Sequence, residues 1–294
     1  MLASRQRLLT TERRSLVLEG FEHGYADVSG TRLHYVAGGE GDPLVLLPGW
    51  PRTWWQFHKM MPTLARQHRV IAVDLRGMGG SQKPESGYDK KTMARDVYEL
   101  VRTLGYERVG IAGEDIGSMV AFSFAANHPD VTAKLALWEP GHPDESFRNF
   151  TMLPSPGMPH LWWFAFNQID ELPEKLLAGR FRLIIDHLVD LQSDPALISD
   201  HDRAVYAAAY DEPSAVRASN GWYQAFGQDI DDAATYPVLN MPVLALGGKY
   251  FPAVQALVKG RASNIRFVEF VGAGHYLSEE RPEELARELL AFFG

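Results

Sequence analysis

The sequence contains no cysteine among its 294 residues. Disulfide bonds, zinc sites built on thiolates and cysteine nucleophiles are therefore excluded. Positive charge is also scarce, because 29 Lys and Arg residues stand against 37 Asp and Glu residues, and no basic run typical of nucleic-acid binding is present. No apolar run reaches the roughly 20 residues that a transmembrane helix needs. This composition favours a small neutral or apolar ligand and predicts neither nucleic acid nor membrane as a partner.

The first 20 residues carry four arginines, Arg5, Arg7, Arg13 and Arg14, but no apolar stretch like that of a secretory signal. We expect this segment to be a loosely docked extension and the protein to be cytoplasmic. The sequence leaves the oligomeric state open, a homodimer included.

Short apolar runs that end at Gly or Pro recur along the chain and are typical of strands buried on both faces of a parallel sheet. These runs cover residues 43–49, 69–77, 108–117, 134–141, 242–249 and 265–274. Helical spacing of apolar residues follows at 92–105, 117–130 and 281–294, and residues 22–38 resemble a β-hairpin. The alternation predicts an α/β fold with a mostly parallel sheet flanked by helices.

Residues 141–234 contain no run of this kind and show helical patterns instead. We therefore predict an α/β core, residues 1–140 plus 235–294, with an inserted helical cap at 141–234. A cleft between two such parts is a common place for a ligand.

The segment Gly113-Glu114-Asp115-Ile116-Gly117 lies between a predicted strand and a predicted helix. This is the context of a nucleophile elbow, in which small residues allow a sharp turn that exposes the central side chain, normally Ser. Asp115 is ionised near neutral pH and can attack an electrophilic carbon directly to form an ester. The alternative is a structural role, in which Asp115 caps the following helix.

A covalent ester needs a base that activates water, and His275 is the histidine that follows the last predicted core strand. Nine other histidines compete, and a lone histidine is often structural. The base needs an orienting carboxylate. The segment after residues 243–246 has no acid, so we assign Glu139, at the end of the run 134–141, with a surface ion pair as its alternative role.

Together these residues resemble the α/β-hydrolase fold epoxide hydrolases over residues 22–294, most specifically in the Asp-bearing elbow, LPGWP, DLRGMGGS and VGAGHYLSEERP. The resemblance implies an oxyanion hole formed by the main-chain N–H groups of Trp50 and Ile116, and a cis peptide bond between Trp50 and Pro51. The chain departs from the family pattern at Pro48 and Glu114, where histidine is common, so the sequence leaves open how the loop at Pro48 is held.

Epoxide hydrolases of this kind usually hold the epoxide oxygen with two polar groups of the cap. The segment NGWYQAF supplies Tyr223 at one of these positions, and HLWWFAF supplies Trp162 and Trp163 at the other. The pairing resembles the epoxide hydrolases of kinamycin- and fluostatin-type aromatic polyketide pathways, which implies a role in antibiotic biosynthesis. Tyr223 can donate a proton, whereas an indole N–H is only a hydrogen-bond donor. One of the two tryptophans is equally well explained by packing inside the cap.

The sequence thus predicts an epoxide hydrolase that works through an aspartyl ester on an aromatic or polycyclic epoxide, without a metal or an organic cofactor. A haloalkane-type dehalogenase would use the same Asp, His and acid, although Ile116 stands where such enzymes place Trp or Arg. A non-catalytic binding protein on the same fold is the third hypothesis.

Overall fold

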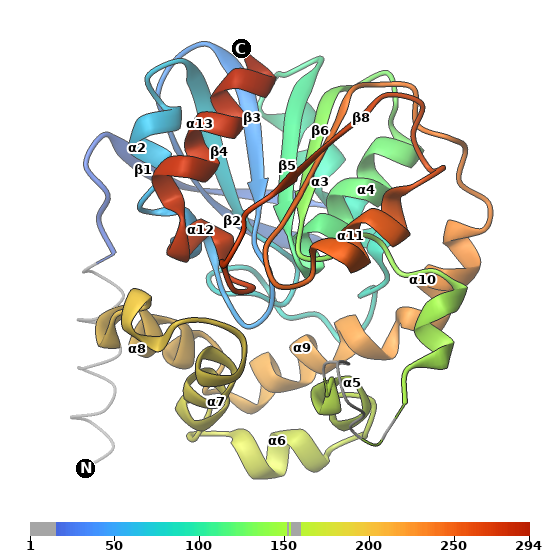
Figure 1. Cartoon of the computed structure of the whole chain (residues 1–294). Helices are drawn as coiled ribbons and strands as arrows, with labels where there is room; N and C mark the ends of the chain where they lie inside the picture. Colours follow the sequence, from blue (N-terminus) through green and yellow to red (C-terminus); the bar gives the residue numbers. More distant parts are fainter. Residues whose placement is uncertain (1–15, 152, 154–159) are drawn as a thin grey trace.

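The computed structural model describes residues 16–151, 153 and 160–294, and most of the expected N-terminal extension, residues 1–15, lies outside the described part. Eight strands form one sheet in the order β1-β2-β4-β3-β5-β6-β7-β8 (Figure 1). The strands are β1 (Phe21–Val28), β2 (Thr31–Gly38), β3 (Asp42–Leu47), β4 (His68–Asp74), β5 (Val109–Glu114), β6 (Thr132–Trp138), β7 (Val243–Gly247) and β8 (Ile265–Glu269).

The sheet is antiparallel only at its N-terminal edge. Strand β1 pairs with β2 as the expected hairpin and β2 pairs with β4 in the antiparallel sense, whereas every neighbour from β4 to β8 is parallel. The six apolar runs of the sequence all form strands of this parallel part, so the predicted α/β fold is confirmed. Because parallel strands end at a common edge, the loops after β5, β6 and β8 meet there.

Helices cover the faces of the sheet (Figure 1). They are η1 (Trp54–Phe57), α2 (Met61–Leu64), α3 (Lys90–Thr103), α4 (Ile116–Asn127), α11 (Phe251–Val258), α12 (Leu277–Glu280) and α13 (Pro282–Phe293). Helix α3 begins where the Asp89 side chain accepts a hydrogen bond from the Thr92 N–H, a typical N-cap. Helix α4 is apolar all round and buried along nearly its whole length, as expected for a helix in the centre of a domain.

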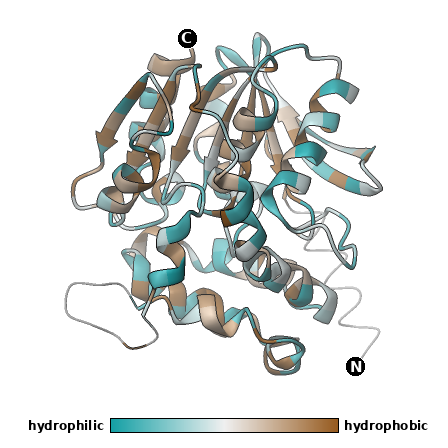
Figure 2. Cartoon of the chain, turned by 90° about the vertical axis from the view of Figure 1, so that its right-hand side faces the viewer, coloured by the Kyte–Doolittle hydropathy of each residue, from teal (hydrophilic) through white to brown (hydrophobic). Residues whose placement is uncertain are grey.

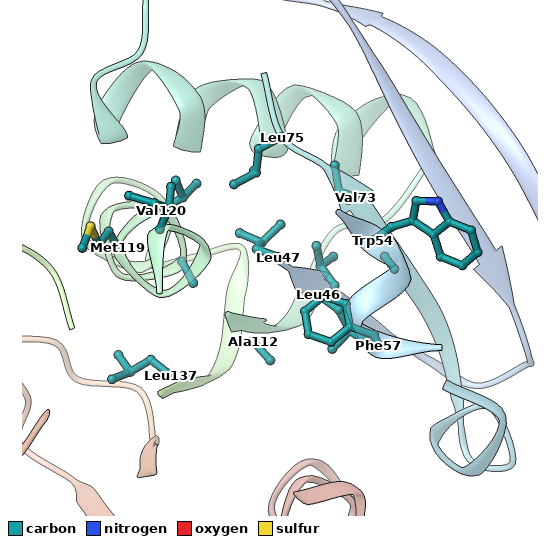
Figure 3. Close-up of a cluster of buried hydrophobic side chains, with 14 of the residues drawn as sticks. Leu46, Leu47, Trp54, Phe57, Val73, Leu75, Ala112, Met119, Val120 and Leu137 are labelled. Atoms are coloured by element: carbon teal, nitrogen blue, oxygen red, sulfur yellow. The ribbon is translucent and has the colours of Figure 1, made fainter. Parts of the chain in front are cut away.

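The hydrophobic core lies between the central strands and the helices beside them. Leu47 of β3, Leu137 of β6 and Val120 of α4 are fully buried and belong to one cluster (Figure 3). Hydrophobic residues are concentrated along the strands (Figure 2). Burial of each such side chain contributes roughly 1.5–3 kcal/mol to the free energy of folding. The parallel strands therefore form a rigid base for the loops at their ends.

We call residues 141–234 the cap segment, and its described residues form helices joined by loops, without a strand. It contains η2 (Glu145–Asn149), α5 (Trp162–Phe166), α6 (Leu172–Leu177), α7 (Arg182–Gln192), η3 (Pro195–Leu197), α8 (Asp200–Ala209), α9 (Pro213–Gln224) and α10 (Phe226–Ala233). Helix α6 packs against α9 and α7 against α8, below the ends of the strands in Figure 1. The division of the chain into two domains at these bounds remains a prediction.

Several buried polar contacts join the cap segment to the α/β core. The Tyr210 hydroxyl donates a hydrogen bond of 2.6 Å to the main-chain oxygen of Arg52. Lys90 at the start of α3 forms a fully buried ion pair of 2.6 Å with Asp229 of α10. Within the described residues, no helix is both long and apolar enough to cross a membrane.

Candidate active site

Asp115 stands between β5 and α4 in a sharp turn. Its backbone has φ +54° and ψ −120°, a conformation that non-glycine residues rarely adopt and that is found at functional turns. The turn needs glycine at 117, because a Cβ there would collide with the main chain of Leu47 and Pro48. The Asp115 side chain makes no N-cap hydrogen bond to α4, so the helix-cap interpretation is wrong.

The Asp115 carboxylate instead faces the loop after β3. Its Oδ1 accepts a hydrogen bond of 2.8 Å from the Trp50 N–H, and the Trp50–Pro51 peptide bond is cis, which confirms that prediction. Burial raises the pKa of Asp115, while the neighbouring His275 and the N–H groups of Trp50 and Ile116 act in the opposite direction. The structure therefore places the Asp115 carboxylate beside the two N–H groups expected to form an oxyanion hole.

Gln56 holds the loop that the sequence left unexplained. Its Oε1 accepts a hydrogen bond of 3.0 Å from the Gly49 N–H, and its Nε2 donates one of 2.7 Å to Glu114 Oε2. Ser278 donates a second hydrogen bond to the same Glu114 oxygen. One buried amide thus joins Glu114 to the Gly49 N–H, next to Pro48, and the sequence alone gave no indication of this link.

His275 lies between the two carboxylates expected to work with it. Its Nδ1 is 3.2 Å from Glu139 Oε2, and its Nε2 is 3.7 Å from Asp115 Oδ2. A carboxylate accepts hydrogen bonds, so we assign the imidazole proton to Nδ1, which leaves the Nε2 lone pair directed toward Asp115. Burial lowers the pKa of His275 to about 4, so the imidazole is neutral and able to act as a base near pH 7.

Glu139 is completely buried behind this imidazole. Burial raises its pKa, whereas the hydrogen bonds from the N–H groups of Gly248 and Tyr250 lower it. Every hydrogen bond at this carboxylate comes from a group that can donate, an arrangement that stabilises the ionised form. The position rules out the exposed ion pair considered as the alternative role for Glu139.

Tyr223 of α9 approaches the site from the cap segment. It is 1% exposed, and its ring lies 5.3 Å from the Trp50 ring, measured between centroids. Burial and the charge of Asp115 raise the pKa of Tyr223 well above its usual value, while a side-chain hydrogen bond with Trp163 lowers it. Because an indole N–H can only donate, the Tyr223 oxygen accepts this bond and its own proton stays available to another partner.

The two neighbouring tryptophans of α5 have different surroundings. Trp163 is buried beside Tyr223, whereas the Trp162 ring contacts those of Phe166 and His187 at 5.8 and 5.6 Å between centroids. The structure therefore brings Trp163 next to Tyr223, and Trp162 packs edge-on against Trp163, with ring centroids 6.0 Å apart.

The site is enclosed by protein, with only 14% of the Asp115 side chain exposed. A pocket of about 200 Å³ lies elsewhere, between the β1–β2 hairpin, Trp54 and α8, and none of the candidate site residues lines it. Within the described part of the chain, no group of His, Asp or Glu side chains could hold a metal ion.

Comparison with known proteins agrees with this fold. A family model for the alpha/beta hydrolase fold matches residues 42–282. The chain belongs to this family. It is 35% identical to a soluble epoxide hydrolase from Corynebacterium sp. (strain C12), an alignment that covers 92% of this chain and 96% of that protein.

The chain is also similar to a solved epoxide hydrolase structure and to a dehalogenase. The solved structure of the epoxide hydrolase CorEH superposes with a TM-score of 0.81 at 34% identity and covers 93% of this chain and 98% of its own. A fluoroacetate dehalogenase from Burkholderia sp. is 28% identical over 94% of this chain and 95% of its own length. This member of the family thus has homologues among both epoxide hydrolases and dehalogenases.

Proposed function

We propose that this protein hydrolyses an epoxide to a vicinal diol through an ester on Asp115. The observation that carries the proposal is the placement of a strained, buried carboxylate between two groups of opposite function. The neutral His275 imidazole lies on one side and the protonated Tyr223 hydroxyl approaches from the cap segment. The homology to epoxide hydrolases supports the same chemistry.

The first step is alkylation of the enzyme. Oδ1 of Asp115 is held by the Trp50 N–H, so Oδ2 is the oxygen that attacks the epoxide carbon. A new C–O bond forms while the strained C–O bond of the epoxide breaks. The leaving oxygen takes its proton from Tyr223, assisted by Trp163, which donates a hydrogen bond to the Tyr223 oxygen and stabilises the phenolate that results.

The second step is hydrolysis of the ester. His275 Nε2 removes a proton from water, and the hydroxide attacks the ester carbonyl carbon of Asp115. Charge then develops on Oδ1, where the N–H groups of Trp50 and Ile116 stabilise it. The bond between Cγ and Oδ2 then breaks, and the departing oxygen takes the remaining proton of the attacking hydroxide, which restores the Asp115 carboxylate and releases the diol. Glu139 stabilises the imidazolium until its proton returns to the Tyr223 phenolate, so that water is added to the epoxide overall.

Aromatic side chains near Asp115 support an aromatic substrate. Trp50 contacts both Phe181 and Tyr223 edge-on, with ring centroids 6.4 and 5.3 Å apart, and Trp163 lies beside the hydroxyl of Tyr223. Such rings favour a flat apolar ligand. We propose that the substrate is an aromatic or polycyclic epoxide. A role in an aromatic polyketide pathway stays a prediction from the sequence resemblance.

A single-turnover reaction in 18O-labelled water, with enzyme in excess over epoxide, tests the proposal. Water attacks the ester carbonyl, so the label is expected in the Asp115 carboxylate and the first diol formed is expected to be unlabelled. Label found directly in the first diol would show that water opens the epoxide without a covalent intermediate.

The fluoroacetate dehalogenase homologue favours dehalogenation as the second candidate. Asp115 and His275 could displace a halide by the same two steps. The residue after the nucleophile is Ile116, however, and it offers no cation for a substrate carboxylate. Halide release from haloalkanes or haloacids, without turnover of a panel of epoxides from styrene oxide to polycyclic aromatic epoxides, would reverse this order.

A further inference from the structure

The imidazole of His275 is flanked by two tyrosine rings that a single side chain of the cap segment connects. The ring centroids of Tyr250 and Tyr276 lie 5.4 and 4.9 Å from that of His275. The Tyr250 hydroxyl donates a hydrogen bond of 3.2 Å to Gln192 Oε1, and Gln192 Nε2 donates one of 3.2 Å to the Tyr276 hydroxyl. Gln192 is the last residue of α7 and only 4% exposed.

The main chain of Gln192 reaches the same histidine. The N–H groups of Gly274 and Tyr276, on either side of His275, both donate to the Glu280 carboxylate next to the sheet. The His275 N–H between them donates instead to the Gln192 main-chain oxygen, at 2.9 Å. The cap segment therefore holds His275 directly, and not only through its neighbours.

We propose that Gln192 is a positioning residue that fixes the plane of the His275 imidazole. The inference rests on the proposed function, because it assigns Gln192 to the step in which His275 activates water. The imidazole must keep Nδ1 at Glu139 and Nε2 toward Asp115 at the same time. The two tyrosine rings restrict its rotation, and the Gln192 amide holds both rings in place.

The chemistry of an amide suits this role. Gln192 donates at one end and accepts at the other, so it satisfies both hydroxyls at once. The Tyr250 main-chain N–H also donates a hydrogen bond to Glu139. A shift of Tyr250 would therefore displace Glu139 as well as the ring beside His275. Leucine has a similar size but makes neither bond, and glutamate accepts hydrogen bonds but cannot donate to Tyr276 when ionised.

Gln192→Leu removes both side-chain bonds and keeps the main-chain bond to His275. Gln228→Leu, on the exposed face of α10, is the matched control within the cap segment. Rapid mixing with an epoxide that the parent turns over gives separate rates for ester formation and ester hydrolysis. We expect Gln192→Leu to slow hydrolysis about 10-fold or more, because small displacements of a catalytic group cost up to about 10²-fold. Ester formation should change less than about 3-fold, so the ester accumulates.

Hydrolysis at the parental rate in Gln192→Leu would overturn the inference, as would an equal loss in both rates. Gln192→Glu gives an independent readout, since a carboxylate at the hydroxyls of the two tyrosines that flank the imidazole stabilises the imidazolium. The acid limb of the pH profile for hydrolysis should then move upward by about one pH unit, since a nearby like or opposite charge commonly shifts a pKa by that amount. An unchanged profile would contradict the role. A parent that forms no ester with any epoxide would refute the proposed function itself.

Discussion

The sheet edge and the cap segment contribute to the candidate site in different ways. Asp115, Glu139 and His275 follow β5, β6 and β8, and main-chain hydrogen bonds fix each of them. The cap segment contributes side chains on helices, Tyr223 and Gln192. The comparison suggests that the sheet edge carries the covalent chemistry, whereas the cap segment assists the departing oxygen and the base. Substitutions at the sheet edge should therefore abolish a step of the reaction, whereas substitutions in the cap segment should slow one.

The largest effect on turnover is expected for a substitution at the sheet edge. Asp115→Asn removes the attacking carboxylate and should lower turnover by about 10⁴-fold or more, as loss of a nucleophile does elsewhere. Asp231→Asn, an exposed carboxylate of the cap segment, is the control and should keep parental activity. Steady-state assays of both proteins on the same epoxide measure the difference. Parental turnover by Asp115→Asn would favour a non-catalytic role for the elbow.

A smaller effect on ester formation is expected for substitutions in the cap segment. Tyr223→Phe removes the proton donor and should slow ester formation by about 10²-fold, with hydrolysis of the ester much less affected. Trp163→Phe should slow the same step by about 10-fold, because it removes the hydrogen bond to Tyr223. Stopped-flow measurement of both steps tests this. Equal losses in the two steps would contradict the assignment of Tyr223 to the departing epoxide oxygen.

Trp162→Phe is the matched control for this pair of tryptophans. Trp162 contacts Phe166 and His187 rather than Tyr223, so its substitution should change either rate by less than about 3-fold. An effect as large as that of Trp163→Phe would show that both tryptophans reach the substrate.

The pH dependence of ester hydrolysis reports on the base. An unperturbed histidine, with a pKa near 6.5, would lose about 10-fold in rate at pH 5.5. Burial lowers the pKa of His275 to about 4, so the neutral form persists and the rate should change by less than about 2-fold between pH 8 and pH 5.5. A decline centred near pH 6.5 in the single-turnover hydrolysis rate would contradict the buried, neutral state.

Glu114, at the end of β5, should make the stability of the folded protein depend on pH. Burial raises its pKa to about 8, so the folded protein keeps a proton that the unfolded chain loses above about pH 4.5. Its contribution to folding is therefore greatest below pH 4.5 and declines as the pH rises toward 8. Glu114→Gln removes this dependence, and its melting temperature relative to the parent should rise by about 4 °C between pH 5 and pH 8. A constant difference would show that Glu114 is ionised when folded.

The sequence predicted the sheet side better than the cap side, for a physical reason. Buried parallel strands require continuous apolar runs, and the turns after them require glycine at positions such as Gly117, so both leave local patterns. The cis bond before Pro51 followed from the family resemblance. Gln56 and Gln192 could not be found in this way, because each acts through contacts between segments far apart in the chain. The different surroundings of Trp162 and Trp163 likewise depend on how helices pack.

The central claim is a covalent bond to Asp115, and intact-mass spectrometry of His275→Ala tests it most directly. This variant keeps the nucleophile, Tyr223 and the oxyanion hole, but it lacks the base that hydrolyses the ester. After incubation with an epoxide that the parent turns over, its mass should increase by that of one epoxide molecule, and peptide mapping should place the adduct on Asp115. An unmodified protein under these conditions would contradict the account.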